Sequence, residues 1–117
     1  MMNYRKKGSQ GEDFAAEYLR KKGLRIIDRN FRFRRGEIDI IAEDGGVLVF
    51  VEVKARWSHS YGDPEDAVSA SKCRQIERVA QGFVGLHRLD DRPYRFDVVA
   101  VEYEGEKQVI RHIENAF

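Results

Sequence analysis

Two carboxylates and one amine lie close together in an otherwise apolar part of the sequence. Asp39 interrupts the run GEIDIIA, while Glu52 and Lys54 belong to the run VLVFVEVKA. Carboxylates are rare within such runs unless they are paired or bind a metal. Mg²⁺ prefers one or two carboxylates, several waters and phosphate oxygens, and a lysine beside the ion could position an attacking water. These residue types therefore indicate metal-assisted chemistry on a phosphate group.

A plain ion pair is the alternative for the same three residues. Lys54 could pair with Asp39 or Glu52 at the end of a hairpin and take part in no reaction. The pattern D…E-x-K is short and often arises by chance, so the hairpin by itself does not exclude this alternative.

The elements that must bring these residues together are two strands joined by a tight turn. Residues 38–42 and 47–53 are rich in β-branched and aromatic side chains, which favours strands covered on both faces. Asp44-Gly45-Gly46 between them is typical of a hairpin turn. With Gly45-Gly46 as a two-residue loop, Asp39 lies directly opposite Glu52. With Asp44-Gly45 as the loop, Asp39 lies diagonal to Glu52. In both registers Asp39, Glu52 and Lys54 share one face.

A helix is predicted over residues 9–22, ahead of this hairpin. Apolar side chains recur at helical spacing from Phe14 to Leu19, and Gly23 supplies a C-terminal stop. Ser9 and Glu12 match a capping box, in which Glu12 reaches back to the main chain of Ser9. Glu12 could instead be a third acid that faces the hairpin, and the sequence leaves both interpretations open.

Arginines and phenylalanines alternate after a strand predicted at residues 24–29. In residues 30–35, NFRFRR, guanidinium groups could bind phosphates while the rings stack on bases of single-stranded or distorted nucleic acid. The alternative is an edge strand in which Phe31 and Phe33 pack inward and the arginines, which are Arg32, Arg34 and Arg35, lie in solvent.

A polar loop and a second helix follow the hairpin. The loop at residues 55–64 could border the site, with Arg56, Trp57, His59 and Tyr61 as phosphate or base contacts, and a short helical turn is predicted at residues 64–68. Ser71 is expected to cap a helix that reaches about Leu86 and buries Ile76, Val79, Ala80 and Phe83. Lys72 and Gln75 lie in its first turn, where a helix N-terminus favours phosphate.

Two further strands are predicted at residues 95–103 and 107–113, joined by a turn at residues 104–106. Asp97 lies between apolar neighbours and could be either a buried polar contact or an acid near the site. The predicted order is helix–strand–strand–strand–helix–strand–strand (αβββαββ).

Length and composition indicate one folded domain over residues 1–117. The chain is 42% hydrophobic and 35% charged, and its single cysteine, Cys73, excludes an internal disulfide. No apolar run is long enough to span a membrane and none follows the basic N-terminus, so we expect a cytoplasmic protein. The net charge of +1 divides unevenly, into +7 over residues 1–35 and −6 over the rest. A basic segment beside an acidic hairpin suits a polyanion held near a cation.

Taken together, these elements resemble a known family. The sequences GEDFAAEYL, GEIDII, VFVEVKAR, YGDPEDAV, SKCRQI and RFDVVAVE are similar to those of the YraN family of small bacterial proteins. An acid on a first helix followed by D-x(12)-E-x-K on a hairpin also resembles PD-(D/E)xK nucleases of the Holliday-junction-resolvase type. The resemblance implies an α/β, restriction-endonuclease-like core with a central mixed β-sheet flanked by helices. The proline of the motif is absent, since Glu37-Ile38 precede Asp39.

The resemblance also implies roles for individual residues. Asp39 and Glu52 would bind Mg²⁺ or Mn²⁺ together with the carbonyl of Val53, Lys54 would be the catalytic lysine, and Glu12 an accessory acid. The implied partner is DNA, either branched or single-stranded, bound by the set Arg32, Arg34, Arg35, Arg56, Lys72 and Gln75. The analogy with resolvases also allows a homodimer. The alternative function is a non-catalytic nucleic-acid-binding or adaptor protein that keeps the nuclease fold.

Overall fold

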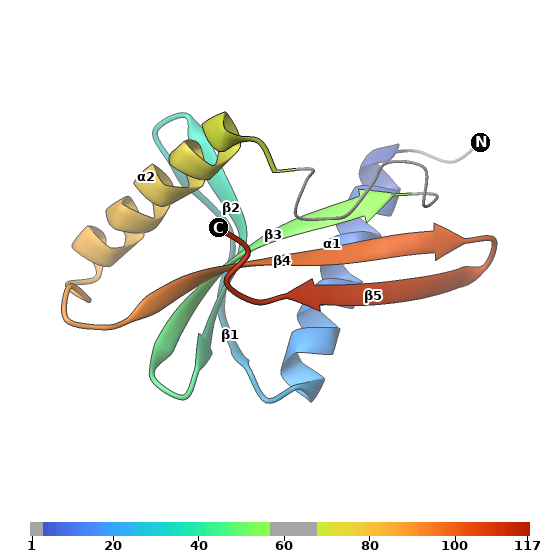
Figure 1. Ribbon diagram of the computed structural model, residues 1–117, viewed down its shortest axis with the longest axis horizontal. Coiled ribbons are helices and arrows are strands. Elements are labelled where there is room, and N and C mark those ends of the chain that lie inside the picture. The colour runs from blue at the N-terminus through green and yellow to red at the C-terminus, as the bar shows by residue number, and fades with distance from the viewer. Residues whose placement is uncertain (1–3, 57–67) are drawn as a thin grey trace.

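A computed structural model describes residues 4–56 and 68–117. Two helices and five strands follow one another along the chain in the order α-β-β-β-α-β-β (Figure 1). Their bounds are α1 Tyr4–Lys21, β1 Arg25–Phe33, β2 Gly36–Asp44, β3 Val47–Arg56, α2 Ala70–Leu86, β4 Tyr94–Glu104 and β5 Lys107–Ile113. The α/β class expected from the sequence is confirmed.

The five strands form one mixed sheet in the order β1-β2-β3-β4-β5. β3 and β4 are parallel, whereas the other neighbouring pairs are antiparallel. A parallel pair needs a crossover connection, and α2 supplies it here. The β2–β3 hairpin pairs Asp44 with Val47, so Gly45-Gly46 is the two-residue loop, and both glycines have positive φ.

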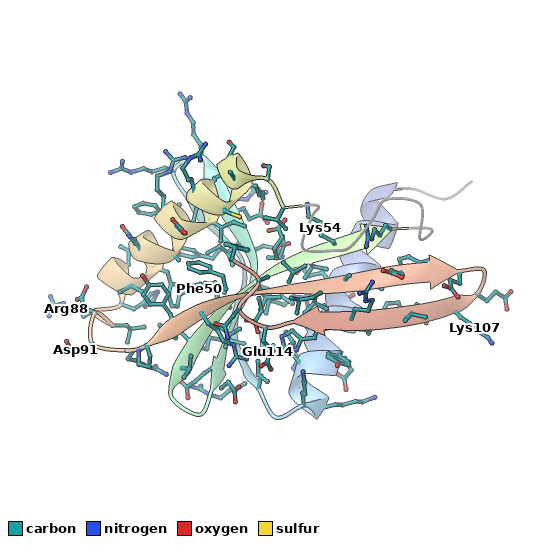
Figure 2. All side chains as sticks on the ribbon, in the orientation of Figure 1. Phe50, Lys54, Arg88, Asp91, Lys107 and Glu114 are labelled. Carbon is teal, nitrogen blue, oxygen red and sulfur yellow. The ribbon has the colours of Figure 1, made fainter. Side chains whose placement is uncertain are left out.

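The helices cover opposite faces of this sheet. α1 packs Ala15, Ala16 and Leu19 against Val49, Val51, Val99 and Val101. α2 packs its predicted apolar face, Ile76, Val79, Ala80 and Phe83, against a cluster that contains Ile38, Leu48 and Phe50. Figure 2 shows Phe50 in this layer between α2 and the sheet. The fold is therefore a helix–sheet–helix sandwich with a core on each side.

Both helices begin earlier than the sequence patterns predict. α1 starts at Tyr4, so Ser9 lies within the helix and the predicted capping box is wrong. Good helix formers in residues 4–7 extend the helix past Gly8. α2 is capped by Ser69 rather than Ser71, because the Oγ of Ser69 accepts a 3.1 Å hydrogen bond from the main-chain N–H of Lys72. The helical turn predicted at residues 64–68 falls largely outside the described residues.

β1 is an edge strand that extends four residues past its predicted end. Phe31 and Phe33 pack against the core under α2, while Arg32 is exposed. The edge-strand interpretation of the NFRFRR segment is therefore correct for the packing of its rings. Within the residues that the structure describes, no helix is long and apolar enough to cross a membrane.

Candidate functional site

Asp39 lies where β2 and β3 separate. The main-chain ladder between these strands runs from Asp44–Val47 to Ile40–Val51. Past that point the main-chain N–H of Val53 donates a 2.8 Å hydrogen bond to Oδ2 of Asp39. The carboxylate thus takes the place of a main-chain acceptor, which fixes its position against β3.

The alternation of side chains along β2 is interrupted at this residue. Ile38 packs in the core under α2, whereas Ile40 packs in the core under α1. In a regular strand two residues this far apart point to the same face. The neighbouring strand is irregular at the same level, since Asn30 has a φ of 56°. This double irregularity directs Asp39 into the gap between β2 and β3.

Glu52 follows on β3 and is almost fully buried, with 7% of its surface exposed. The Nζ atom of Lys54 lies 3.6 Å from its Oε1, and the Nζ atom of Lys72 lies 4.0 Å from the same oxygen. Lys54, which is labelled in Figure 2, comes from β3 itself, and Lys72 comes from the first turn of α2. Two amines from different elements therefore converge on one buried carboxylate.

Glu12 reaches the same region from α1. Gly11 makes this approach close, because a Cβ at Gly11 would lie 3.0 Å from the Cβ of Ala55 on β3. The Oε1 atom of Glu12 accepts hydrogen bonds from Nε of Arg29 at 2.9 Å and from Nδ2 of Asn30 at 3.0 Å. A cavity of about 400 Å³ is lined by Glu12, Asp39, Val53, Lys54 and Ala55. Of the two interpretations of Glu12, the structure therefore agrees with the one in which Glu12 is an acid that faces the hairpin.

Burial and like charge make this cavity unfavourable for free carboxylates. Burial raises the pKa of Asp39 to about 7, and the neighbouring charges of Glu52, Glu12 and Glu37 add to the rise. Burial also raises the pKa of Glu52, while the positive charges of Lys72 and Lys54 oppose that rise. A cation placed between the two carboxylates would favour the ionised form of both.

The residues predicted to bind nucleic acid lie in three places. Lys72 lies at Glu52, as described above. Arg32, Arg34 and Arg35 are exposed at and beside the β1–β2 turn, although Arg32 pairs with Glu37 at 3.4 Å. Gln75 donates a 3.0 Å hydrogen bond to the carbonyl of Arg35 and so ties this turn to α2. The structure corrects the prediction that Arg56 contacts nucleic acid. Arg56 is buried and its guanidinium lies 3.4 Å from Glu102, so it is not available at the surface.

Comparison with known proteins places these residues in a family. The sequence profile of "Uncharacterised protein family UPF0102" matches residues 11–101. The chain belongs to the UPF0102 family. The resemblance to YraN proteins that the sequence indicates is thereby confirmed. The matched segment contains Glu12, Asp39, Glu52 and Lys54, and it extends past Lys72.

Individual UPF0102 relatives are similar over nearly their whole length. A UPF0102 protein of Symbiobacterium thermophilum is 51% identical over 114 residues, which cover 97% of each chain. One from Syntrophotalea carbinolica is 48% identical over 110 residues, covering 94% of this chain and 89% of that protein. Among solved structures, SfsA of Pyrococcus furiosus in complex with Ca²⁺ overlaps with a TM-score of 0.38 at 14% identity. That overlap covers 97% of this chain and 64% of SfsA, and a score this low does not establish a shared fold.

The candidate metal ligands at this site, the carboxylates of Asp39 and Glu52, are oxygen donors. Among the described residues there is no group of three or more His, Cys, Asp or Glu side chains placed to hold a metal. Two carboxylates, those of Asp39 and Glu52, are nevertheless the number that Mg²⁺ ordinarily takes from protein, with waters and substrate oxygens completing six positions. The N–H of Val53 points toward β2, and its carbonyl leaves the strand on the same edge, where the ladder has ended. The set therefore fits Mg²⁺ or Mn²⁺ rather than zinc.

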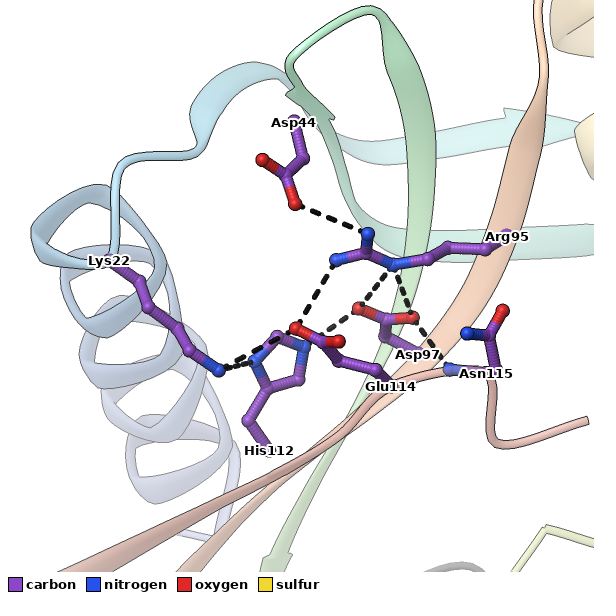
Figure 3. Close-up of polar contacts among 7 residues, drawn as sticks. All are labelled: Lys22, Asp44, Arg95, Asp97, His112, Glu114 and Asn115. Carbon is purple, nitrogen blue, oxygen red and sulfur yellow. Dashed lines mark hydrogen bonds and ion pairs between the residues drawn. The ribbon is translucent and has the colours of Figure 1, made fainter.

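Asp97 belongs to a different cluster on β4. Its Oδ2 lies 2.7 Å from Nε2 of His112, and it also accepts hydrogen bonds from Nε of Arg95 and the main-chain N–H of Asn115, both at 3.1 Å. Figure 3 shows this network, which also includes Lys22, Asp44 and Glu114. Asp97 is therefore a buried polar contact, not an acid of the candidate site. Trp57, His59 and Tyr61 lie outside the described residues.

The residues that hold Glu12 do not follow from the sequence pattern. Local pattern assigns Arg29 to a strand and Asn30 to a nucleic-acid-binding segment, and it pairs neither residue with an acid. The signal in the sequence is weak, because an irregularity in an edge strand carries no composition of its own. Asn30 at a positive φ is the one local hint, since asparagine tolerates that conformation better than most residues.

Proposed function

We propose that this protein is a metal-dependent endonuclease that cleaves phosphodiester bonds of DNA, with branched or distorted DNA as its substrate. The observation that carries the proposal is the position of Asp39. Its carboxylate is held by the N–H of Val53 beside the buried Glu52, at the edge of a cavity that Lys54 also lines. Two acids can hold a divalent metal at a scissile phosphate, and a lysine beside them can orient the attacking water.

The residues of the candidate site have distinct roles in this proposal. Asp39 and Glu52, with the carbonyl of Val53, would hold Mg²⁺ or Mn²⁺. A bound divalent metal would supply Lewis-acid activation of the scissile phosphate and a water of lowered pKa. Lys54 orients the attacking water and offsets negative charge that develops on the phosphate. Its 3.6 Å contact with Glu52 holds the amine in position before substrate binds.

Glu12 is the accessory acid of the proposal. Its Oε1 is held by Arg29 and Asn30, so its position does not depend on a metal. Glu12 lines the same cavity as Asp39, and its negative charge favours a cation near Asp39. Arg29 also pairs with Asp13 at 2.7 Å, which anchors the guanidinium between α1 and β1.

We further infer that the fold is restriction-endonuclease-like, of the PD-(D/E)xK kind. The support is the mixed sheet with the acids on the hairpin β2–β3, and a helix on each face. The missing proline does not weaken the chemistry, because it would supply no ligand. Glu37 and Ile38 stand ahead of Asp39, and Ile38 packs in the core under α2.

A second candidate function is a nucleic-acid-binding or adaptor protein without catalysis. The observation in its favour is that Lys54 and Lys72 both lie within ion-pair distance of Glu52. Two amines could neutralise this carboxylate with no metal present. The two functions differ in their response to Mg²⁺, because only the nuclease requires it.

A cleavage assay with site variants tests the proposal. Labelled four-way-junction, flap, single-stranded and duplex DNA are incubated in Mg²⁺ with wild type, Glu52→Gln, Lys54→Ala and the control Glu106→Gln. Glu106 is an exposed carboxylate in the β4–β5 turn. We expect Glu52→Gln and Lys54→Ala each to lower the cleavage rate by roughly 100-fold or more, and the control to cleave as wild type does. Wild-type rates in a folded Glu52→Gln variant would contradict the assignment.

A further inference from the structure

A groove lies beside the candidate site, between α2 and the turn that joins β1 to β2. It has a volume of about 730 Å³. The turn contributes residues 33–36, and α2 contributes Gln75, Arg78, Val79, Gln81 and Gly82. Three of the lining residues are arginines and none is acidic, so the groove is strongly basic.

The arginines of the groove are not neutralised by acidic side chains of the described residues. Among the described residues, no carboxylate forms an ion pair with Arg34, Arg35 or Arg78. Arg29 and Arg95, in contrast, each contact acidic side chains at 3.2 Å or less. Guanidinium groups gathered around one concavity without such contacts are available to bind an anion, and guanidinium binds phosphate oxygens in a bidentate geometry.

The two walls of the groove contact each other directly. Gln75 on α2 donates its 3.0 Å hydrogen bond to the carbonyl of Arg35 in the turn. Gly36 and Gly82 allow the two walls to approach, because a Cβ at either position would collide with Val79 or with the ring of Phe33. The shape is therefore set before any ligand binds, which lowers the entropic cost of binding.

The guanidinium plane of Arg34 is a flat surface in the groove, and the ring of Phe33, which packs on Gly82, lies behind it. The guanidinium of Arg34 lies over the ring of Phe33, 5.4 Å from its centroid. Nucleic-acid bases stack on aromatic rings and on guanidinium planes, and they do so when they are unpaired. A duplex turns its bases inward and would leave this surface unused, so the groove favours a single strand.

The groove begins next to the candidate site. Lys72, at 4.0 Å from Glu52, and Gln75, which lines the groove, are three residues apart and neighbours on the surface of α2. Arg78 follows one turn further along. A strand whose phosphate lies at Glu52 can thus continue along α2 over the arginines.

We propose that this groove binds a single-stranded nucleic-acid segment, with Arg34, Arg35 and Arg78 on its phosphates and an unpaired base on the Arg34–Phe33 surface. This inference rests on the proposed function, and it implies that the substrate is a DNA with a single-stranded segment beside the cleaved bond. Arg32 is not part of the groove, since it does not line it and pairs with Glu37.

Binding measured without metal tests this proposal separately from cleavage. The affinity for a labelled single-stranded oligonucleotide of 12 nucleotides is measured by fluorescence anisotropy in EDTA. Wild type is compared with the double variant Arg35→Ala/Arg78→Ala and with the control Arg88→Ala. Arg88 carries the same charge at the α2–β4 connection (Figure 2) and does not line the groove. A duplex of the same sequence and a mononucleotide are titrated in parallel, and thermal melts check that each variant is folded.

The proposal predicts that the double variant binds the single strand at least tenfold more weakly. The slope of log affinity against log salt should fall by about 1.4, as expected for two lost phosphate contacts. Arg88→Ala should bind nearly as wild type does. An equal loss of single-strand affinity in the double variant and in the control would overturn the proposal. So would tighter binding of the duplex than of the single strand, or binding of the mononucleotide as tight as that of the single strand. In each of these cases, a loss of cleavage in Glu52→Gln would still support the proposed function, so the two proposals can fail separately.

Discussion

The carboxylate of Asp39 accepts its 2.8 Å hydrogen bond from the main-chain N–H of Val53 where the β2–β3 ladder ends. The acid is therefore positioned by the central sheet rather than by a flexible loop. Glu52 directly precedes Val53 on β3, so the two carboxylates share one rigid support. Sites held by sheet elements keep their geometry with little reorganisation.

Replacing Asp39 by Asn should stabilise the metal-free protein at neutral pH. Asn keeps an oxygen that accepts the Val53 hydrogen bond but removes a buried charge. The pKa of Asp39 is raised from 3.8 to about 7 by burial and by neighbouring acids. A carboxyl group with a raised pKa binds more protons in the folded state, so the free energy of unfolding falls as pH rises between these values.

We expect Asp39→Asn in EDTA to be more stable than wild type at pH 8 by about 1–3 kcal/mol, with the difference shrinking toward about pH 4. Urea denaturation followed by circular dichroism across this pH range measures it. A variant less stable than wild type at pH 8 would show that the Asp39 carboxylate is stabilised by contacts beyond the Val53 hydrogen bond. The same variant should lose metal-dependent cleavage.

Two glycines of α2 give a matched pair for testing the packing under the groove. At Gly82 a Cβ would meet the ring of Phe33, whereas at Gly85 nothing lies within 4 Å. Gly82→Ala should therefore lower the free energy of unfolding by about 1–3 kcal/mol. Gly85→Ala should leave it unchanged or raise it by up to about 1 kcal/mol, since alanine favours helix. Thermal or urea unfolding distinguishes them, and equal effects would contradict the close packing of Phe33 on Gly82.

The Asp97 cluster should contribute stability that is lost in acid. Burial alone raises the pKa of Asp97, but hydrogen bonds from His112, Arg95 and Asn115 outweigh it and hold the pKa below its ordinary value. A carboxylate with a lowered pKa stabilises the fold above the pKa of the unfolded chain, and this stability disappears as pH falls through the folded value.

Asp97→Asn is therefore expected to lower the free energy of unfolding at pH 7 by about 2–4 kcal/mol. The gap between wild type and variant should close below about pH 4. Urea midpoints from pH 3 to 7 provide the measurement. A gap that stays constant over this range would mean that the charge of Asp97 has no part in the effect.

The strands can be predicted because they follow from local pattern, whereas the sequence leaves two hairpin registers open and the structure has the one with Gly45-Gly46 as the loop. Alternating or continuous β-branched runs mark β2, β3 and β4, and a Gly-Gly turn restricts the loop to two residues. The bounds predicted for the last strand are those of β5, Lys107–Ile113. Two-residue loops of either register suffice to bring Asp39 and Glu52 near each other, because cross-strand partners share a face.

Helix starts and tertiary partners cannot be predicted in the same way. Ser69 and Ser71 are both of a residue type that caps helices well, so local pattern does not choose between them. Arg56 has the composition of a phosphate contact, yet Glu102, 46 residues away, holds it in the interior. The groove cannot be predicted from local sequence, because Arg78 and Arg34 come together only when α2 packs on the β1–β2 turn.

The most direct test of the central claim is a metal titration of cleavage by the wild-type protein. Labelled four-way-junction, flap, single-stranded and duplex DNA are incubated with increasing Mg²⁺ or Mn²⁺, and then with excess EDTA. We predict product that rises with metal and stops with EDTA on at least one DNA that carries a single-stranded segment or a junction. Folded protein that binds these DNAs but cleaves none of them in either metal would contradict the nuclease and support the adaptor.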